Sequence, residues 1–266
     1  MIACRVLGVG IAAPGLADWA AAQPILTGTT PYIAAPMPRL NPARLPANER
    51  RRASAAIRLA LAVADEAAQA AGIDPAQTAT VFTSSGGDID VVHGICQALC
   101  EPAPALSPTA FHNSVHNAPA GYWSIATGAT PPYTALSALD GSVAAGLIEA
   151  CTQLLSEGGP ILMVAYEVPM PLPLSTQRPA HEAFACALVL DRATATGTSR
   201  LELEYLDDLD QTRETTLENP ALEILRRDNA AARVLPLLAL LATDRPGQVT
   251  LPSNSEGWLR LRYTSC

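Results

Sequence analysis

The sequence predicts an α/β protein in which one sheet is covered by helices on both faces. Short, strongly apolar runs alternate with Ala- and Leu-rich helical segments along most of the chain, as in layered α/β folds. Of the 266 residues, 49% are hydrophobic, 16% are charged and 5% are aromatic, so the core must consist of small aliphatic side chains. No repeat or linker divides the chain, and we expect a single domain over residues 1–266.

Apolar runs bounded by Gly or Pro predict the strands, which we place at residues 4–11, 78–84, 133–138, 160–168 and 182–190. Residues 200–206 alternate as a half-exposed strand, and short strands are expected at 248–252 and 258–263. Helical segments are predicted at 49–71, capped by Gly72, at 88–99, capped by Asp88, and at 117–127, 141–150, 220–227 and 230–242. The Pro-rich segments 23–48 and 101–108 and the acidic segment 207–218 are expected to be surface loops.

Gly8 and Gly10 invite a dinucleotide-binding interpretation, which the surrounding residues do not support. That motif needs a third glycine opening a helix, whereas Pro14 lies where the helix should begin. We therefore expect Gly8 and Gly10 to belong to a buried strand and the turn after it. No cofactor is predicted.

Charge and cysteine usage limit the possible partners. The net charge of −8 argues against general nucleic-acid binding. The predicted helix 49–71 begins with Arg50, Arg51 and Arg52, which form either a solvated face or a contact for an anion or an acidic protein. No apolar run is long enough to cross a membrane, and residues 1–22 are better explained by a buried strand than by a signal peptide. The six scattered cysteines are typical of reduced thiols in a cytoplasmic protein; Cys96 and Cys100 near His93 lack further ligands, and no metal is predicted.

Residues 111–151 contain a strand, a tight turn and a helix of small residues, an arrangement that many enzymes use to present a nucleophile at a helix N-terminus. The turn contains Asp140. The simplest interpretation is that Asp140 caps the helix 141–150. A catalytic role is less favoured, because helix N–H groups lower the pKa of a carboxyl group and make it a weak base.

Two further sets of polar residues flank the turn. His112, Asn113, His116 and Asn117 are interpreted as a hydrogen-bonded structural segment or as part of an interface or partner pocket, because the H-E-x-x-H metal pattern is absent. Ser137 and Ser142 are alternative nucleophiles, but neither lies in a G-x-S-x-G elbow.

Residues 117–150, NAPAGYWSIATGATPPYTALSALDGSVAAGLIEA, resemble the N-terminal half of a β-ketoacyl synthase of the thiolase fold. In that family an N-x-x-A-G-x-x-S-I-x-x-G segment leads into a strand, the nucleophilic cysteine and a small-residue helix. Residues 6–15 and 53–86 resemble the family's opening strand, first long helix and second strand. The resemblance covers residues 3–190, with 191–266 as a divergent C-terminal part of the same domain. It implies a truncated, thiolase-like α-β-α fold.

The departures from the family pattern are as informative as the matches. The nucleophile position falls at Asp140, or in another register at Leu136 or Ser137, and none of these is a cysteine. Of the four histidines none lies beyond residue 181, so the family's catalytic histidines and lysine cannot be carried over. The resemblance therefore implies a non-catalytic, chain-length-factor-like subunit that forms a heterodimer with a full-length β-ketoacyl synthase. Such subunits serve polyketide, aryl polyene or fatty-acid-type chain elongation and meet the acyl carrier protein indirectly.

The resemblance also implies which residues meet the partner. The family dimer joins through the strand before the nucleophile turn, which assigns Tyr133, Thr134, Leu136 and Ser137 to the interface. Phe111, His112 and Ser114 are implied at the end of the partner's acyl tunnel, with Asn113, His116 and Asn117 beside them. The alternative is a small stand-alone acyltransferase or ketosynthase-like enzyme using Ser137, Ser142 or Asp140.

Overall fold

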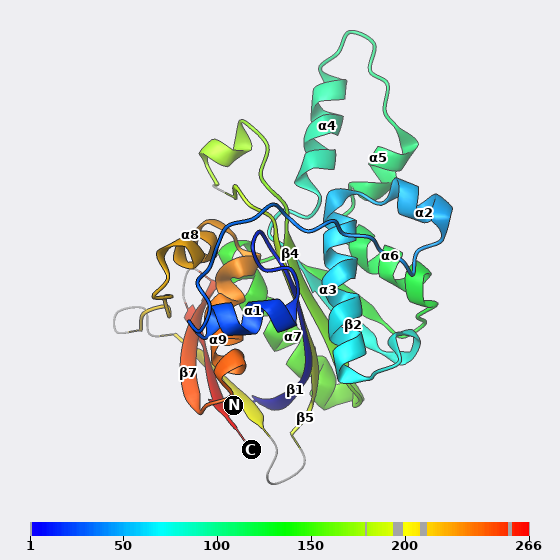
Figure 1. The fold of residues 1–266 in the computed structure, drawn as a ribbon. Coiled ribbons are helices and arrows are strands. Elements are labelled where there is room, and N and C mark those ends of the chain that lie inside the picture. Colours follow the sequence, from blue (N-terminus) through cyan, green and yellow to red (C-terminus); the bar gives the residue numbers. More distant parts are fainter. Residues whose placement is uncertain (1, 179, 194–198, 208–211, 255–256, 266) are drawn as a thin grey trace.

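The computed structural model describes residues 2–178, 180–193, 199–207, 212–254 and 257–265. In this part of the chain an eight-stranded sheet forms the centre of the molecule, in the order β3-β2-β4-β5-β1-β6-β8-β7 (Figure 1). Its strands are β1 (Ile2–Ala12), β2 (Ala79–Thr83), β3 (Tyr133–Leu136), β4 (Ile161–Glu167), β5 (Phe184–Arg192), β6 (Arg200–Leu206), β7 (Gly247–Asn254) and β8 (Gly257–Thr264). Every strand predicted from the sequence is present.

The sheet is mixed. Strand β2 pairs in parallel with β3 and with β4, whereas the other neighbours pair antiparallel. The strands β6, β8 and β7, from the part of the chain expected to be divergent, continue the same sheet beyond β1. Strand β3 forms one edge of the sheet and β7 forms the other.

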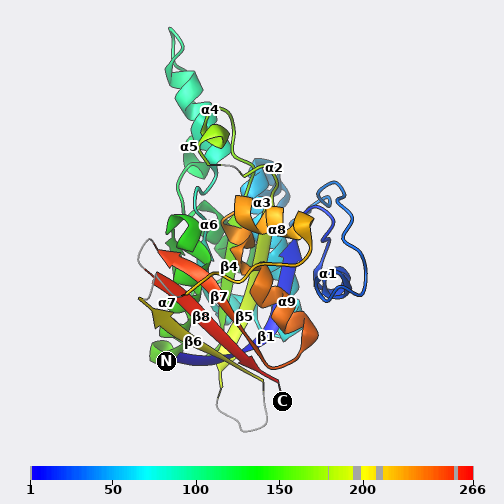
Figure 2. The same cartoon turned by 90° about the vertical axis from the view of Figure 1, so that its left-hand side faces the viewer.

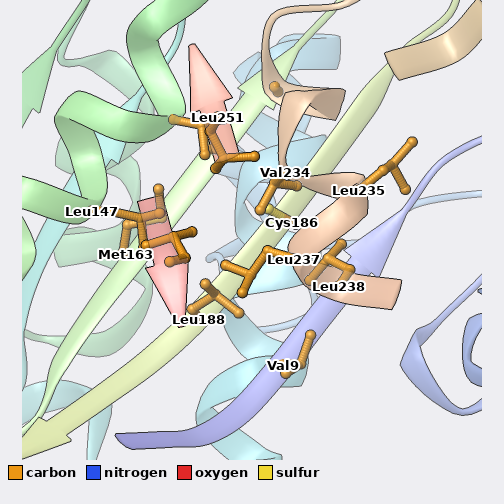
Figure 3. Packing of buried hydrophobic residues seen from close by; sticks show 14 of the residues in the cluster. Val9, Leu147, Met163, Cys186, Leu188, Val234, Leu235, Leu237, Leu238 and Leu251 are labelled. Atoms are coloured by element: carbon orange, nitrogen blue, oxygen red, sulfur yellow. The ribbon is translucent and has the colours of Figure 1, made fainter. Parts of the chain in front are cut away.

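Helices cover both faces of the sheet, and the turned view in Figure 2 shows these layers. One face packs against α3 (Ala55–Ala71) and α6 (Ala118–Thr127) through a core that includes Phe82, Leu162 and Val164. The other packs against α7 (Ser142–Glu157) and α9 (Leu235–Thr243), and Figure 3 shows that core around Met163, Leu188 and Leu237. Because side chains alternate along a strand, adjacent residues such as Leu162 and Met163 lie in different cores. Strands β2 and β4 are fully buried and β5 is buried over Phe184–Leu190, whereas β1 is only half-buried in its first half and β3 is half-buried or exposed.

Gly8 and Gly10 lie in β1, where they allow α3 to approach the sheet. A Cβ atom at Gly10 would lie 2.2 Å from the carbonyl oxygen of Val63, and one at Gly8 would lie 2.3 Å from that of Ala67. These distances are far below van der Waals contact, so the two positions require glycine. Close helix-to-sheet packing explains this pair of glycines.

The predicted single helix 49–71 is wrong, because two helices occupy this segment. The first, α2 (Ala47–Arg52), ends at Ala53, and Ser54 caps α3 by accepting a hydrogen bond from the backbone N–H of Ile57 at 3.3 Å. The last turn of α2 therefore contains Arg50, Arg51 and Arg52, which do not lie at a helix start. Positive charge is favourable there, because the C-terminal end of a helix dipole is negative. The cap at Gly72 is confirmed by its left-handed φ of 65°.

Two helices are missing from the sequence-based prediction, α1 (Trp19–Leu26) and α5 (Pro108–Asn113). Helix α1 (Trp19–Leu26) overlaps the start of the predicted loop 23–48 and contains Pro24. Asp18 caps it by accepting a hydrogen bond from the N–H of Ala21 at 2.8 Å. Near the other end of the chain, α8 (Pro220–Asp228) matches the predicted helix 220–227.

An arm built from α4 (Ile89–Leu99) and α5 (Pro108–Asn113) projects from the body of the molecule (Figure 1, Figure 2). The predicted cap of α4 is confirmed, since Asp88 accepts a hydrogen bond from the N–H of Val91. No residue of α4 is buried. Among the described residues, no helix is both long and apolar enough to cross a membrane.

Candidate functional site

The turn between β3 and α7 has a strained residue at its tip. Leu139, in the 3-10 turn η2 (Leu139–Gly141), has a φ of 51°, a left-handed value that is costly for a residue with a bulky side chain. Ser142 fixes the turn: its hydroxyl donates to the carbonyl of Leu139 at 2.6 Å and accepts from the N–H of Ala138 at 3.0 Å. The Leu139 side chain is 61% exposed, so its own packing does not explain this conformation.

The C-terminal hairpin supports this turn from behind. A Cβ atom at Gly141 would lie 1.5 Å from the carbonyl oxygen of Ser253 in β7. The backbone of β7 therefore packs directly on the turn, and any larger residue at position 141 would displace one of them. Residues near the C-terminus thus fix the geometry of the candidate site.

The interpretation of Asp140 as the cap of the following helix is wrong. Helix α7 begins at Ser142 and its cap residue, Gly141, makes no side-chain capping bond. Asp140 instead accepts a hydrogen bond from Arg178 at 2.7 Å, in an ion pair whose carboxylate is 58% exposed. Such solvated ion pairs contribute little to stability. The strained residue of the turn is Leu139, one position before Asp140.

A buried carboxyl group, absent from the sequence-based candidates, lies below the turn. Glu167, at the end of β4, is 2% exposed, and its Oε1 accepts hydrogen bonds from the hydroxyl of Ser84 at 2.8 Å and from the backbone N–H of Ser85. Burial raises the pKa of Glu167 above its ordinary value, and the hydrogen bonds from Ser84 and Ser85 oppose that rise. The carboxyl group ties the loop after β2 to the end of β4.

These residues surround a polar hollow of about 160 Å³ at the carboxyl ends of the parallel strands. Its wall is formed by Ser85, Asp140, Met170, Glu167, Gln177, Arg178, Ala180, Arg227, Asp228 and Ala230. This wall contains carboxyl and guanidinium groups but neither a thiol nor an imidazole. The chemistry of a cysteine nucleophile activated by histidine cannot take place on these side chains.

The two serines considered as alternative nucleophiles have other hydrogen-bond partners. The hydroxyl of Ser137 donates to the carbonyl of Ser85 at 3.1 Å, and that of Ser142 is engaged in the turn. A nucleophilic serine needs a base within hydrogen-bond reach. The hydrogen bonds of Ser137 and Ser142 in the described part of the chain do not include a histidine.

The polar segment 112–117 makes hydrogen bonds at each of the four predicted positions. Asn113 is 3% exposed; its amide donates to the carbonyl of Arg52 at 2.9 Å and accepts from the hydroxyl of Tyr122 at 3.1 Å. The ring of His112 lies 3.2 Å from the Asn113 oxygen and packs edge-on against Tyr122. These contacts join α5 to α2 and α6.

The other half of this segment joins the arm to the sheet. The ring of His116 lies 3.1 Å from the carbonyl oxygen of Ser84, and the Asn117 amide donates to the hydroxyl of Tyr133 at 3.2 Å. The Ser114 hydroxyl donates to the carbonyl of Phe111 at 2.8 Å. The described residues contain no group of three metal-ligating side chains, either here or near Cys96 and Cys100.

Exposed apolar side chains collect between α5, α6 and β3. Phe111 is 66% exposed, Ile125 51%, Val115 49% and Tyr133 40%, and these four residues line one shallow hollow. Val115 and Ile125 are not among the predicted site residues, since an exposed apolar residue cannot be told from a buried one by its type alone. The predicted interface residues Phe111 and Tyr133 are brought together here.

Strand β3 leaves one row of backbone groups open. The carbonyls of Pro132 and Leu136 accept hydrogen bonds from the N–H groups of Thr80 and Ser84, so they face β2. Backbone groups alternate in direction along a strand. Those of Tyr133 and Ala135 therefore face away from β2, toward the open edge of the sheet.

The family model for the N-terminal domain of β-ketoacyl synthases matches residues 19–259. The chain belongs to the β-ketoacyl synthase family. The match continues beyond residue 190, into the part expected to be divergent. No significant similarity to a curated protein sequence was found.

Solved structures share the fold of this β-ketoacyl synthase family member over its full length. The ketosynthase in complex with its chain length factor from Xenorhabdus doucetiae is 21% identical with a TM-score of 0.73, over 98% of this chain and 100% of the solved chain. The ishigamide ketosynthase/chain length factor is 12% identical with a TM-score of 0.74, over 99% of each chain. A type II polyketide ketosynthase in complex with its acyl carrier protein is 14% identical with a TM-score of 0.73, over 100% of this chain and 99% of the other. The predicted thiolase-like ketosynthase fold is confirmed.

Proposed function

We propose that this chain is a non-catalytic, chain-length-factor-like subunit that pairs with a full-length β-ketoacyl synthase. The main observation behind this proposal is the turn between β3 and α7. The turn is strained as a nucleophile turn would be, but the strained residue at its tip is Leu139. The hollow beside the turn is lined by neither cysteine nor histidine. A leucine side chain cannot form a thioester with an acyl group. The subunit acts through its partner, in the cytoplasm, in polyketide, aryl polyene or fatty-acid-type chain elongation.

Three features support the heterodimer. Strand β3 has an open edge, which another strand can extend. Four exposed apolar side chains lie next to that edge. The arm helix α4 has no fully buried residue, and its Leu99 is 55% exposed. Exposed apolar side chains and open strand edges of this kind are what protein partners cover.

The proposed partner is a full-length ketosynthase, because the solved relatives include ketosynthases described together with a chain length factor. In this arrangement Tyr133, Thr134, Leu136 and Ser137 lie at the interface, with Phe111 reaching toward the partner's acyl tunnel beside His112 and Ser114. The acyl carrier protein delivers its substrate to the partner's cysteine, so its contact with this chain is indirect.

The heterodimer is tested by blocking the open edge of β3. Ala135→Pro removes an N–H group that faces away from β2, so the fold should survive while pairing with the partner is lost. The matched control, Ala135→Val, keeps that N–H group and favours a strand. Size-exclusion chromatography with a ketosynthase encoded by a neighbouring gene measures pairing, and thermal unfolding of each variant alone measures folding.

We expect the wild type and Ala135→Val to co-elute with the ketosynthase and Ala135→Pro to elute alone. Co-elution of a folded Ala135→Pro variant would remove β3 from the interface. The stand-alone enzyme is the opposing outcome. Turnover of acyl-carrier-protein thioesters by the purified chain alone, or a covalent acyl adduct on Ser137, Ser142 or Asp140, would overturn the non-catalytic assignment.

A further inference from the structure

A second hollow, of about 200 Å³, borders the first, with Asp228 in the walls of both, and none of its lining residues is among those assigned to the proposed interface. It is enclosed by α8, the segment around Tyr32 and the segment around Glu182. Figure 1 shows α8 apart from α6 and from the arm of α4 and α5. A ketosynthase paired along β3 would leave this hollow open.

The walls of the hollow are mostly apolar. They consist of the ring of Tyr32 together with Pro14, Ala34, Ala221, Ile224 and Leu225. Ile224 is 53% exposed, although a large aliphatic side chain on a helix is usually covered. The hollow is therefore a surface from which water would be displaced favourably by an apolar group.

Fixed hydrogen bonds shape these walls, so the hollow exists before any ligand arrives. The hydroxyl of Tyr32 donates to the carbonyl of Pro14 at 2.8 Å, which orients the ring. On the other side, Asn229 is 2% exposed; its amide donates to the carbonyl of Glu182 at 2.9 Å and accepts from the N–H of Ala232 at 3.0 Å. A preformed pocket spends little free energy on ordering its own residues.

The polar groups at the mouth are mainly acidic. Glu182 and Asp228 line the hollow with His181, and the lining includes neither lysine nor arginine. Burial, and then the negative charge of Glu182, raise the pKa of Tyr32. Asp228 also accepts a hydrogen bond from Arg227 at 2.9 Å, so Glu182 is the freer of the two carboxylates.

We propose that this hollow binds a small aromatic ammonium compound. An apolar cavity of about 150 Å³ accommodates a benzene ring, so this one has room for a phenyl group against Tyr32 and Leu225. The ammonium group then lies at the mouth, where the Glu182 carboxylate attracts it and His181 and Asp228 border it. A ligand with a carboxylate or phosphate would be repelled by the same groups.

The probe for this site is 2-phenylethylamine, with 2-phenylethanol and 3-phenylpropionate as neutral and anionic ligands of similar size. Binding to the full chain is measured by chemical-shift changes in NMR spectra. A ligand this small should bind with a dissociation constant on the order of 1 mM. We expect the amine to bind at least about tenfold more tightly than the carboxylate, with the alcohol between them.

Two variants place the ligand in this hollow. Ala221→Trp fills the hollow and should abolish binding of all three probes, whereas Glu182→Gln should reduce the preference for the amine over the alcohol about threefold or more. The control is Glu157→Gln, which removes a negative charge from the exposed end of α7 and should leave the affinities unchanged. If thermal unfolding shows that Ala221→Trp is not folded, Ala34→Trp serves as the second variant that fills the hollow.

Three results would overturn the proposal. One is the absence of shift changes at about 10 mM amine, roughly ten times the expected dissociation constant. Another is equal binding of the three probes. The third is amine binding that persists in a folded variant whose hollow is filled, since the ligand would then be elsewhere. None of these outcomes depends on the ketosynthase partner, so the proposed function is tested separately.

Discussion

At the scale of single residues, the backbone conformation of Leu139 is set by the surrounding turn. Its left-handed φ of 51° is unfavourable for leucine, and its exposed side chain gains little in return. The hydrogen bonds of Ser142 and the packing of β7 on Gly141 impose the backbone path. The strain is therefore a property of the turn and not of the residue that occupies its tip.

This strain can be measured by replacing Leu139 with glycine. Leu139→Gly relieves the left-handed strain, which costs about 1–2 kcal/mol, but it also makes the unfolded chain more flexible by about 0.5–1 kcal/mol. The matched control is Leu139→Ala, which loses the same exposed side chain but keeps Cβ. We expect Leu139→Gly to be more stable than Leu139→Ala by about 0.5–1 kcal/mol in urea unfolding. A more stable alanine variant would show that the position is not strained.

Glu167 provides a second measurement at the residue scale. Its pKa is raised above the ordinary value of 4.5, so the folded state holds this proton more tightly than the unfolded state. The free energy of unfolding should therefore fall as pH rises from 4.5 through the raised pKa, and the loss is complete above it. Below 4.5 both states are protonated and the cost vanishes.

Glu167→Gln removes this contribution while its carbonyl oxygen can still accept from Ser84 and Ser85. Unfolding in urea across this pH range should give a flatter profile for Glu167→Gln than for the wild type. The raised pKa values of Glu66 and Asp88 affect both proteins equally and cancel in the difference. Parallel profiles would contradict the assignment of the pH dependence to Glu167.

At the scale of elements, the contact between β1 and α3 explains a motif that suggests cofactor binding. Gly10 allows the helix backbone to lie against the strand, with the carbonyl of Val63 at a position that a Cβ atom would occupy. Gly94, in the exposed helix α4, has no atom within 4 Å of such a Cβ. The two glycines therefore serve different purposes.

Alanine substitution at these two glycines should have opposite effects. Gly10→Ala forces α3 away from β1 and should destabilise the protein by about 1–3 kcal/mol or more. Gly94→Ala should stabilise it by about 0.5–1 kcal/mol, because alanine favours the helix. Thermal unfolding of the two variants measures both signs. A neutral Gly10→Ala would mean that the helix shifts without loss of core packing.

At the scale of the whole molecule, the apolar surface beside β3 connects this chain to what its proposed partner makes. If Phe111 closes the far end of the partner's acyl tunnel, Phe111→Ala should allow longer products. The matched control is Leu155→Ala in α7, because Leu155 is also an apolar side chain and is 51% exposed. Mass spectrometry of the carrier-protein-bound products measures chain length. An unchanged length with Phe111→Ala would remove Phe111 from the tunnel.

Much of the fold could be predicted from the sequence because its strands are continuous apolar runs bounded by Gly and Pro. The break between α2 and α3 could not, since residues 53–54 include neither Gly nor Pro and only the capping contact of Ser54 reveals it. Helix α1 escapes prediction because Pro24 argues against it. Local pattern sets the type of an element, whereas capping and packing set its ends.

The candidate site is less predictable, because it depends on contacts between distant segments. The sequence favours Asp140 as the cap of α7, but Arg178, from far along the chain, engages its carboxylate. Glu167 carries a usable signal: it is the charged residue in an otherwise apolar strand, and buried charges need specific hydrogen bonds. The hollow beside Glu167 has no sequence signature, since it forms only when the ends of β2 and β4 and residue 178 come together.

The open edge of β3 has a consequence for how the chain must be supplied in a cell. An uncovered strand edge with apolar neighbours can pair with any other chain that presents a strand, including further copies of itself. Synthesis in excess of a covering subunit would then yield aggregates or degraded protein instead of a reserve of free subunits. The amount of this chain that stays soluble therefore depends on how much of the covering subunit is made with it. Co-expression of the two subunits should raise the soluble yield.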